Sequence, residues 1–182
     1  MPDVNVVAIN EQLADLLNID IGFLKSQSGL KFLSGKSSKT LPNSISLAYA
    51  GHQFGHLVPQ LGDGRAVLLG DKICQDGVRR DIQLKGSGKT YFSRGGDGRA
   101  GIGPVIREYL ISESMHHLGV PTTRSLAVLL TGEKVVRAEV SPGAMLARVA
   151  KSHVRVGTFE FFAIRNQKLS LIHISEPTRP LH

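Results

Sequence analysis

A strand pattern that runs directly into a glycine-rich stretch is the feature that most restricts the fold of this chain. Residues 81–85 alternate polar and apolar side chains, which predicts a half-buried strand. Residues 86–103 then contain seven glycines, and so flexible a stretch predicts a functional loop rather than packed structure. Pro104 follows and suits the first turn of a helix, because its missing N–H would have no partner there. The middle of the chain is therefore a strand, a glycine loop and a helix, in that order.

The letters KGSGKT at residues 85–90 end like a phosphate-binding P-loop, G-x-x-x-x-G-K-[ST]. If Gly88 is the second glycine of that motif, the first must stand at position 83, which is Gln83. The P-loop interpretation therefore fails. A strand that runs straight into Lys85 suggests a different device, in which Lys85 itself projects from the strand towards a phosphate and Lys89 is incidental.

Two hairpins are predicted around this centre. Asp76-Gly77 is a strong turn signal between a strand at 66–69 and the strand at 81–85, and the letters TGEK at 131–134 predict a second hairpin. Two apolar stripes on the helix after Pro104 predict that this helix is buried on more than one side. The remaining predicted elements are an amphipathic helix within 5–24, a loop over 27–43, a helix stop at Gly119, a strand at 144–149 and a helix at 158–165.

The charge of the chain favours anionic partners. The 182 residues carry a formal net charge of +7 and 41% hydrophobic residues, which fits one folded basic domain. Aromatic residues make up only 5% and no Lys/Arg block is dense, so a nucleic-acid partner gains no support. The single Cys74 fits a reducing compartment. Without a signal peptide or an apolar run of membrane-spanning length, we expect a cytoplasmic location and no membrane partner.

The order of charged residues follows the logic of a kinase amino-terminal lobe. The element GDGRA occurs at 62–66 and again at 96–100, as two copies of one turn chemistry. A glycine turn with Arg65, a hairpin, the strand lysine Lys85, a glycine loop and a helix carrying Glu108 come in kinase order. A lysine stem is flexible, so a paired carboxylate fixes its ammonium where a phosphate will lie.

Four segments carry a family resemblance: AYAGHQFGHLVPQLGDGRAVLLGD, DIQLKGSGKTYFSRGGDGRA, IREYLISESMHHLGVPTTRSLA and RVAKSHVRVGTFEFFA. They closely resemble the SelO (YdiU) family, over about residues 5–165. The resemblance implies a pseudokinase-like α+β fold whose amino-terminal lobe is an antiparallel sheet with helices. It also implies that ATP binds in a flipped orientation, and that AMP is transferred to protein hydroxyls.

The resemblance assigns individual residues as well. Glu108 would position Lys85, while Arg148 and Arg155 would hold the terminal phosphate. The substrate would be ATP with Mg²⁺ or Mn²⁺. The implied ATP-binding set is Gly62, Gly64, Arg65, Lys85, Asp97, Gly98, Arg148 and Arg155.

Structural alternatives remain open for these residues. Glycines at turns often serve backbone conformation alone. Arg148 could be a surface cation, although it lies in an apolar strand run where a charge needs a partner. Glu108 could pair with Arg107 or Lys151 instead of Lys85.

Two other candidates receive structural interpretations. His52 and His56 have a spacing that suggests zinc ligands, but no H-E-x-x-H and no further ligand cluster accompanies them, so capping or hydrogen bonding is favoured. Cys74 lies in a predicted hairpin without a nearby histidine, and we assign it no catalytic task.

The sequence contains neither H-R-D nor D-F-G, the kinase motifs for the catalytic base and the metal-binding acid. We therefore expect no catalytic residue and no metal ligand here, and place both in a missing carboxy-terminal lobe. The final stretch LSLIHISEPTRPLH is unlike the family and resembles a translated sequencing adapter. We divide the chain into a SelO-type region at 1–168 and a non-native tail at 169–182.

The resemblance thus implies part of an ATP-dependent protein adenylyltransferase that modifies Ser, Thr or Tyr of protein substrates, and we expect this part to be inactive by itself. Two alternatives stay open: a protein kinase or other phosphotransferase on the same scaffold, and a non-catalytic ATP-binding pseudokinase module.

Overall fold

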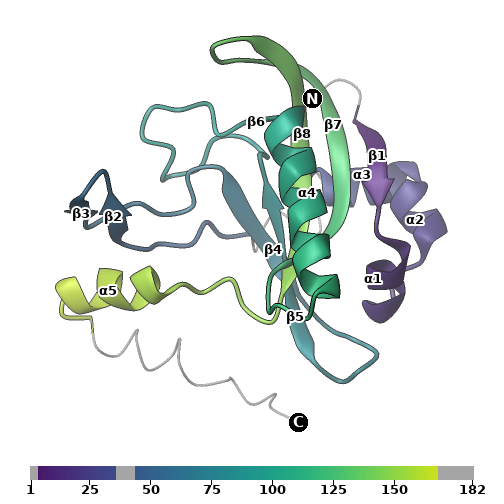
Figure 1. The fold of residues 1–182 in the computed structure, drawn as a ribbon, viewed down its shortest axis with the longest axis horizontal. Helices are drawn as coiled ribbons and strands as arrows, with labels where there is room; N and C mark the ends of the chain where they lie inside the picture. The colour runs from purple at the N-terminus through teal and green to yellow at the C-terminus, as the bar shows by residue number, and fades with distance from the viewer. Residues whose placement is uncertain (1–3, 36–43, 168–182) are drawn as a thin grey trace.

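A computed structural model describes residues 4–35 and 44–167, and an antiparallel sheet forms its centre (Figure 1). In these ranges six strands join the sheet, in the order β1-β7-β8-β5-β4, with β6 paired to β8. The strands are β1 (Asn5–Ile9), β4 (Ala66–Ile73), β5 (Arg79–Lys85), β6 (Ala100–Gly101), β7 (Arg124–Val136) and β8 (Val140–Ala150). The fold is therefore mixed α/β with an antiparallel sheet.

The hairpin predicted at Asp76-Gly77 is confirmed. Strands β4 and β5 pair antiparallel, and the turn is tight because Gly77 has a φ of +73° that other residues rarely adopt. The Asp76 carboxylate accepts a hydrogen bond from the Val78 amide at 3.1 Å, which fixes the turn locally. Because β5 also pairs with β8, it lies inside the sheet.

The second predicted hairpin, at 131–134, is wrong. Strand β7 continues through this segment, and the pairing with β8 resumes at Lys134 after an irregularity that begins at Leu130. Gly132 adopts a φ of +70°, so the turn-like letters encode a bulge within the strand. The actual turn between β7 and β8 lies at residues 137–139.

The amino-terminal prediction is only partly confirmed. The segment predicted as one amphipathic helix starts with the strand β1 and continues into the helices α1 (Glu11–Leu16) and α2 (Ile21–Lys25). The segment predicted as loop from residue 27 instead forms the helix α3 (Gln27–Leu33), while its residues 36–43 lie outside the described ranges. Short side-chain caps start these helices, as at Ser26, whose hydroxyl accepts a hydrogen bond from the Gly29 amide at 3.1 Å.

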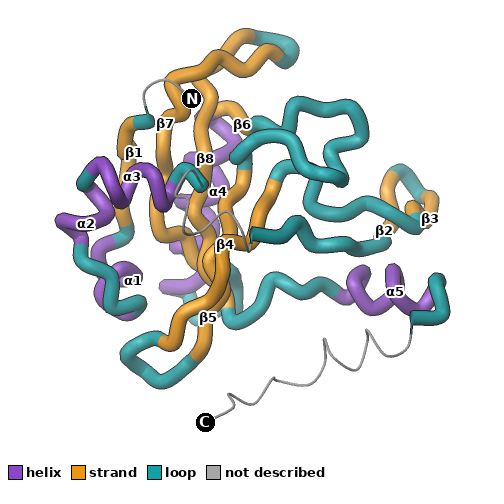
Figure 2. Tube along the Cα trace, turned by 180° about the vertical axis from the view of Figure 1, so that it is seen from behind, coloured by secondary structure: helices purple, strands orange, loops and turns teal. Residues whose placement is uncertain are grey.

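Helices cover the two faces of the sheet unequally. One leucine of each of the helices α1–α3 is buried to 1% exposure or less and packs in one core with Leu84 of β5: Leu13, Leu24 and Leu33. On the other face lies α4 (Ile102–His117), which stands in front of the sheet in Figure 1 and behind it in Figure 2. It packs through Val105 against Val128 and Leu146. The sheet is thus held between three short helices and one long helix.

The prediction that α4 is buried on more than one side is wrong. Leu110 of one apolar stripe and Ile111 of the other are 57% and 58% exposed, so both stripes are largely open on the outer side of the helix. The predicted stop is confirmed, because Gly119 follows the helix with a φ of +77°. Its start near Pro104 is also confirmed, since this residue lies in the first turn.

The carboxy-terminal helix α5 (Val156–Ile164) extends away from the sheet beside a small hairpin of β2 (Gly51–Gln53) and β3 (His56–Val58) (Figure 1). The Ala50 amide donates to the Gly157 carbonyl at 2.7 Å. A Cβ at Gly157 would lie only 1.9 Å from the Ala50 carbonyl oxygen, so glycine is required for this approach. No described helix of the chain has the length and apolar character needed to cross a membrane.

Candidate anion-binding site

A cavity of about 420 Å³ opens where the GDGRA turn, the glycine loop and the end of β8 meet. Among the described residues that line it, seven are basic and only two are acidic. The basic residues are Arg65, Lys85, Arg94, Arg99, Arg137, Arg148 and Arg155, and the acidic ones are Asp63 and Asp97. All eight residues of the predicted ATP-binding set lie along this one cavity. Such an excess of cations suits a multiply charged anion.

The first GDGRA copy forms one wall and requires its glycines. Gly62 has a φ of +64°, and a Cβ there would lie 2.1 Å from the Phe92 ring. A Cβ at Gly64 would lie 2.7 Å from the Phe92 carbonyl oxygen. The two glycines therefore allow the turn to pack directly against the glycine loop. The side chain of Asp63, the residue between the two glycines in the sequence, is buried.

The glycine loop is held in place by short polar contacts. Thr90, the last residue of the P-loop-like letters, donates its hydroxyl to the Asp63 carbonyl at 2.7 Å, and Ser93 donates to the Gly64 carbonyl at 2.6 Å. Lys89 is exposed and does not line the cavity, which agrees with its interpretation as incidental. These contacts make the loop part of the cavity wall rather than a P-loop.

The second GDGRA copy also lines the cavity. Gly98 lies so close to Gly88 that a Cβ would be 1.9 Å from the Gly88 carbonyl oxygen. The Asp97 carboxylate receives two hydrogen bonds from Arg137, at 2.7 Å and 2.9 Å. This pairing, together with the Arg99 amide, lowers the pKa of Asp97 to about 2. Asp97 is therefore ionised and already paired at neutral pH.

Lys85 forms the ion pair with Glu108 that kinase order predicted. Its ammonium at the end of β5 donates to Glu108 Oε2 on α4, and Arg148 of β8 donates to Glu108 Oε1 at 3.2 Å. Arg148 also donates to the Gln83 side chain, so its charge is partnered within the apolar strand, as expected. Arg107 and Lys151 are not the partners of Glu108 in this structure. One carboxylate is thus shared by two cavity cations.

Burial shapes the ionisation of this trio. Burial lowers the pKa of Lys85, and the Glu108 carboxylate only partly opposes that shift. Burial alone would raise the pKa of Glu108, but Lys85 and Arg148 outweigh it and the pKa is lowered. Glu108 is therefore held firmly as an anion, while the ammonium of Lys85 lacks full compensation. An incoming anion would supply the missing negative charge.

Arg155 reaches the cavity from the start of α5. Its guanidinium lies 4.8 Å from the centre of the Tyr49 ring and 3.8 Å from Asp63 Oδ1. Arg148 lies deeper, is only 8% exposed, and its Nε–H has no acceptor among the described residues. Two arginines from consecutive elements thus converge on one end of the cavity.

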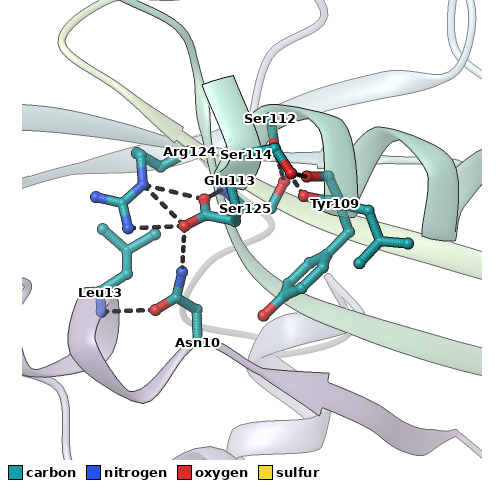
Figure 3. Close-up of polar contacts among 9 residues, drawn as sticks. Asn10, Leu13, Tyr109, Ser112, Glu113, Ser114, Arg124 and Ser125 are labelled. Carbon is teal, nitrogen blue, oxygen red and sulfur yellow. Dashed lines mark hydrogen bonds and ion pairs between the residues drawn. The ribbon is translucent and has the colours of Figure 1, made fainter. Parts of the chain in front are cut away.

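A second glutamate on α4 forms a separate cluster away from the cavity (Figure 3). Glu113 accepts hydrogen bonds from Arg124 Nε and Nη2, at 3.0 Å and 2.7 Å, and from the Ser125 amide at 2.8 Å. The Asn10 amide group donates to it at 2.7 Å and also accepts from the Leu13 amide at the start of α1. Glu113 therefore ties α4 to β7 and to the amino-terminal helices.

The other sequence candidates do not join the site. His52 and His56 lie on the exposed β2–β3 hairpin, and Cys74 is buried at the turn after β4. Residues 4–35 and 44–167 bring no three His, Cys, Asp or Glu side chains together as a metal site.

Comparison with known proteins identifies the family. The family model described as "Protein adenylyltransferase SelO" matches residues 1–177 of this chain. The chain belongs to the SelO family. The resemblance read from the four sequence segments is thereby confirmed.

Curated SelO relatives are close in sequence and much longer. A "Protein nucleotidyltransferase YdiU" of Rhodopseudomonas palustris (strain BisB5) is 60% identical over 163 residues, which cover 90% of this chain and 33% of the relative. The relative of Bradyrhizobium diazoefficiens is 59% identical over 160 residues, which cover 88% of this chain and 33% of the relative. The relative of Alkalilimnicola ehrlichii is 62% identical over 157 residues, which cover 86% of this chain and 32% of the relative. The chain thus spans about a third of their length. The prediction of a non-native tail at 169–182 concerns residues outside the described ranges and stays a prediction.

Sequence reasoning did not single out several residues of the site, among them Tyr49 and Asp63 in the cavity wall and Gln83 next to it. The lining cations that it did not assign are Arg94, Arg99 and Arg137. Asp63 stood within a turn motif whose glycines and arginine drew attention instead. Gln83 was used only to reject the P-loop, although a polar residue between Ile82 and Leu84 on a buried strand is itself a signal.

Proposed function

We propose that this region is the ATP-binding part of a SelO-type protein adenylyltransferase, which transfers AMP to Ser, Thr or Tyr hydroxyls of other proteins. The names of the relatives, protein nucleotidyltransferase and protein adenylyltransferase, support the reaction class. The observation that carries the proposal is the cation-lined cavity with its Lys85–Glu108–Arg148 network. A triphosphate fits its excess of positive charge.

We further propose that the fold is a kinase-like amino-terminal lobe. The support is a lysine at the end of an internal strand paired to a glutamate on the helix that covers the same sheet face, which is the arrangement by which kinases hold nucleotide phosphates. The catalytic base and the metal-binding acid would then belong to the remaining two thirds of the longer relatives. The chain by itself is expected to bind nucleotide without transferring AMP.

The residues of the cavity divide the work. Because glycine has no side chain, the turn and the loop can lie close to the ligand at Gly62, Gly64 and Gly98. Lys85 neutralises phosphate charge, and Glu108 holds its ammonium in place. ATP with Mg²⁺ or Mn²⁺ supplies the adenylyl group and the divalent charge when bound. Arg148 and Arg155 offer guanidinium donors suited to phosphate oxygens, and we assign them the terminal phosphate.

This assignment determines which phosphate reacts. A terminal phosphate held by two arginines is poorly placed for attack, so the α-phosphate would face the acceptor hydroxyl and pyrophosphate would leave with its charge stabilised. The acceptor oxygen forms the new bond to the α-phosphorus as the bond to the leaving pyrophosphate breaks, and the hydroxyl proton would pass to the catalytic base that we place in the remaining part of the longer relatives. Since ATP is the substrate and the single cysteine is unpaired, we place this activity in the cytoplasm.

A protein kinase on the same scaffold is the second candidate, because the Lys85–Glu108 pair is also the kinase device. The two reactions differ in the phosphate that reaches the protein. A chimera in which this chain replaces the matching third of the Alkalilimnicola ehrlichii relative allows the test. We expect label from the α-phosphate of ATP on substrate protein and none from the γ-phosphate. The reverse labelling pattern would favour the kinase.

A further inference from the structure

In the wall of the cavity, a series of polar contacts joins Arg155 and Arg148. Arg155 lies 3.8 Å from Asp63 Oδ1, and Asp63 Oδ2 accepts a hydrogen bond from Gln83 Nε2 at 2.9 Å. The Gln83 oxygen in turn accepts from Arg148 Nη2, and Arg148 Nη1 donates to Glu108 at 3.2 Å. The series therefore runs from Arg155 to Glu108, the carboxylate that also pairs with Lys85.

The two middle residues are the most deeply buried polar side chains of the site. Gln83 is 0% exposed and Asp63 is 3% exposed. A guanidinium can only donate hydrogen bonds and a carboxylate can only accept them, so a group between them must do both. A glutamine amide meets this need in one orientation only. The chemistry of its neighbours thus fixes Gln83 between Asp63 and Arg148.

Asp63 is equally constrained by its backbone. Its amide donates to the Leu47 carbonyl at 2.9 Å, and its own carbonyl accepts from Thr90. Burial raises the pKa of Asp63, and the nearby Arg155 and Arg148 oppose that shift. A buried carboxylate in the wall of an anion site weakens anion binding through charge repulsion. The buried position of Asp63 therefore suggests a role other than its charge.

We propose that Asp63 and Gln83 are positioning residues that fix the separation of Arg155 and Arg148, so that the cavity selects a triphosphate over shorter phosphates. The Tyr49 ring supports the same guanidinium from another side, at 4.8 Å. This inference rests on the proposed function only in taking a polyphosphate as the ligand. It goes beyond the residues that the family resemblance assigned, none of which is Asp63, Gln83 or Tyr49.

The second GDGRA copy shows that the motif alone does not create this arrangement. Asp97 occupies the place in 96–100 that Asp63 occupies in 62–66, yet it is exposed enough to pair with Arg137 at the rim. Burial against Gln83 is therefore a property of the first copy. The difference argues against a purely local role of Asp63 in its turn.

Calorimetric titration of the 182-residue chain with inorganic tripolyphosphate, pyrophosphate and orthophosphate tests the proposal. Both variants keep the side-chain size: Asp63→Asn removes the charge that faces Arg155, and Gln83→Met removes the hydrogen bonds to Asp63 and Arg148. We expect each to weaken tripolyphosphate binding about tenfold, which corresponds to one charge-assisted hydrogen bond, and to change orthophosphate binding less than about twofold. Asp71→Asn removes the same charge from the far end of β4 and is the matched control.

The sign of the Asp63→Asn effect separates positioning from simple charge. If Asp63 only contributes negative charge, its removal must tighten binding of every phosphate, and that result would overturn the proposal. In an Arg155→Ala background, Asp63→Asn should have little further effect, because the guanidinium it positions is gone. Circular dichroism verifies that each variant is folded. If Asp63→Asn does not fold, the tripolyphosphate affinity of Gln83→Met provides the test instead.

The outcomes distinguish this inference from the proposed function. Equal tripolyphosphate affinity of wild type, Asp63→Asn and Gln83→Met would overturn the positioning role and leave the polyphosphate site intact. A wild-type chain that is folded and binds no tripolyphosphate would overturn both.

Discussion

Two glutamates on one helix, Glu108 and Glu113, differ in how their charge is balanced. Both lie on α4 and both accept hydrogen bonds from an arginine of the sheet. Glu113 meets one cation and two neutral donors, and the Glu113 and Arg124 side chains are only 12% and 15% exposed. Glu108 is shared by two cations, and the Lys85–Glu108 pair is about twice as exposed, at 24% and 26%. The first cluster has equal numbers of opposite charges, while the second has two cations for one carboxylate at the cavity.

The comparison predicts opposite results for replacing the two cations. Lys85→Met in the chimera should lower AMP transfer on the order of 100-fold or more, because a phosphate-neutralising charge is lost. Its melting temperature should not fall, since burial already disfavours the ammonium. Transfer from labelled ATP and thermal unfolding measure the two effects. A large loss of stability with normal transfer would reverse the assignment of Lys85.

Arg124→Met should behave in the opposite way. The substitution removes the cation that pairs with the Glu113 carboxylate, which is only 12% exposed. We therefore expect a loss of about 2–3 kcal/mol in the free energy of unfolding. Transfer per folded molecule should stay within about threefold of the wild type, because the cavity cations are untouched. Denaturant unfolding and active-site-normalised rates test this. A rate loss as large as that of Lys85→Met would show that the Glu113 cluster also belongs to the site.

Acid should remove the contribution of the Glu113 carboxylate to the stability of the fold. Burial would raise its pKa, but Arg124, the Ser125 amide and Asn10 outweigh burial and place the pKa below its ordinary value of 4.5. A lowered carboxyl pKa stabilises the fold above the ordinary value, and that stability is lost as the pH falls through the lowered one. The stability gap between wild type and Glu113→Gln should therefore narrow below about pH 4.5. A gap that widens in acid would contradict the direction of this shift.

The smallest effect is predicted for Lys89→Ala. Lys89 is only four residues from Lys85, but it is exposed and lies outside the cavity. Nucleotide affinity should change less than about twofold. Equal losses of nucleotide affinity in Lys85→Ala and Lys89→Ala would instead support a P-loop-like role of residues 85–90.

The sequence predicted the centre of the fold because its signals are local. Strand alternation, the Asp76-Gly77 turn and the helix stop at Gly119 depend on neighbours in the chain, and all three are confirmed. The segment TGEK misled because Gly132 can serve a bulge as well as a turn, and only pairing with β8 decides between them. Likewise residues 27–43 are rich in Ser, Lys and Gly, yet α3 forms at their start and its Leu33 is fully buried in the core with Leu84.

The site was predictable where kinase order and family resemblance supplied it. The residues that sequence reasoning missed have in common that their partners are distant in the chain. Asp63 meets Gln83 across 20 positions, and Gln83 meets Arg148 across 65. No local pattern encodes such contacts, because they arise when β5 pairs with β8 and the GDGRA turn closes over them.

Labelling of substrate protein by the chimera is the decisive measurement. In the proposed function, the cavity holds the terminal phosphate and turns the α-phosphate towards the acceptor. The proposed function predicts protein label from ATP carrying the isotope at the α-phosphate, a weaker signal from Arg148→Ala and Arg155→Ala, and no signal from isotope at the γ-phosphate. Protein label from the γ-phosphate, with none from the α-phosphate, would contradict it.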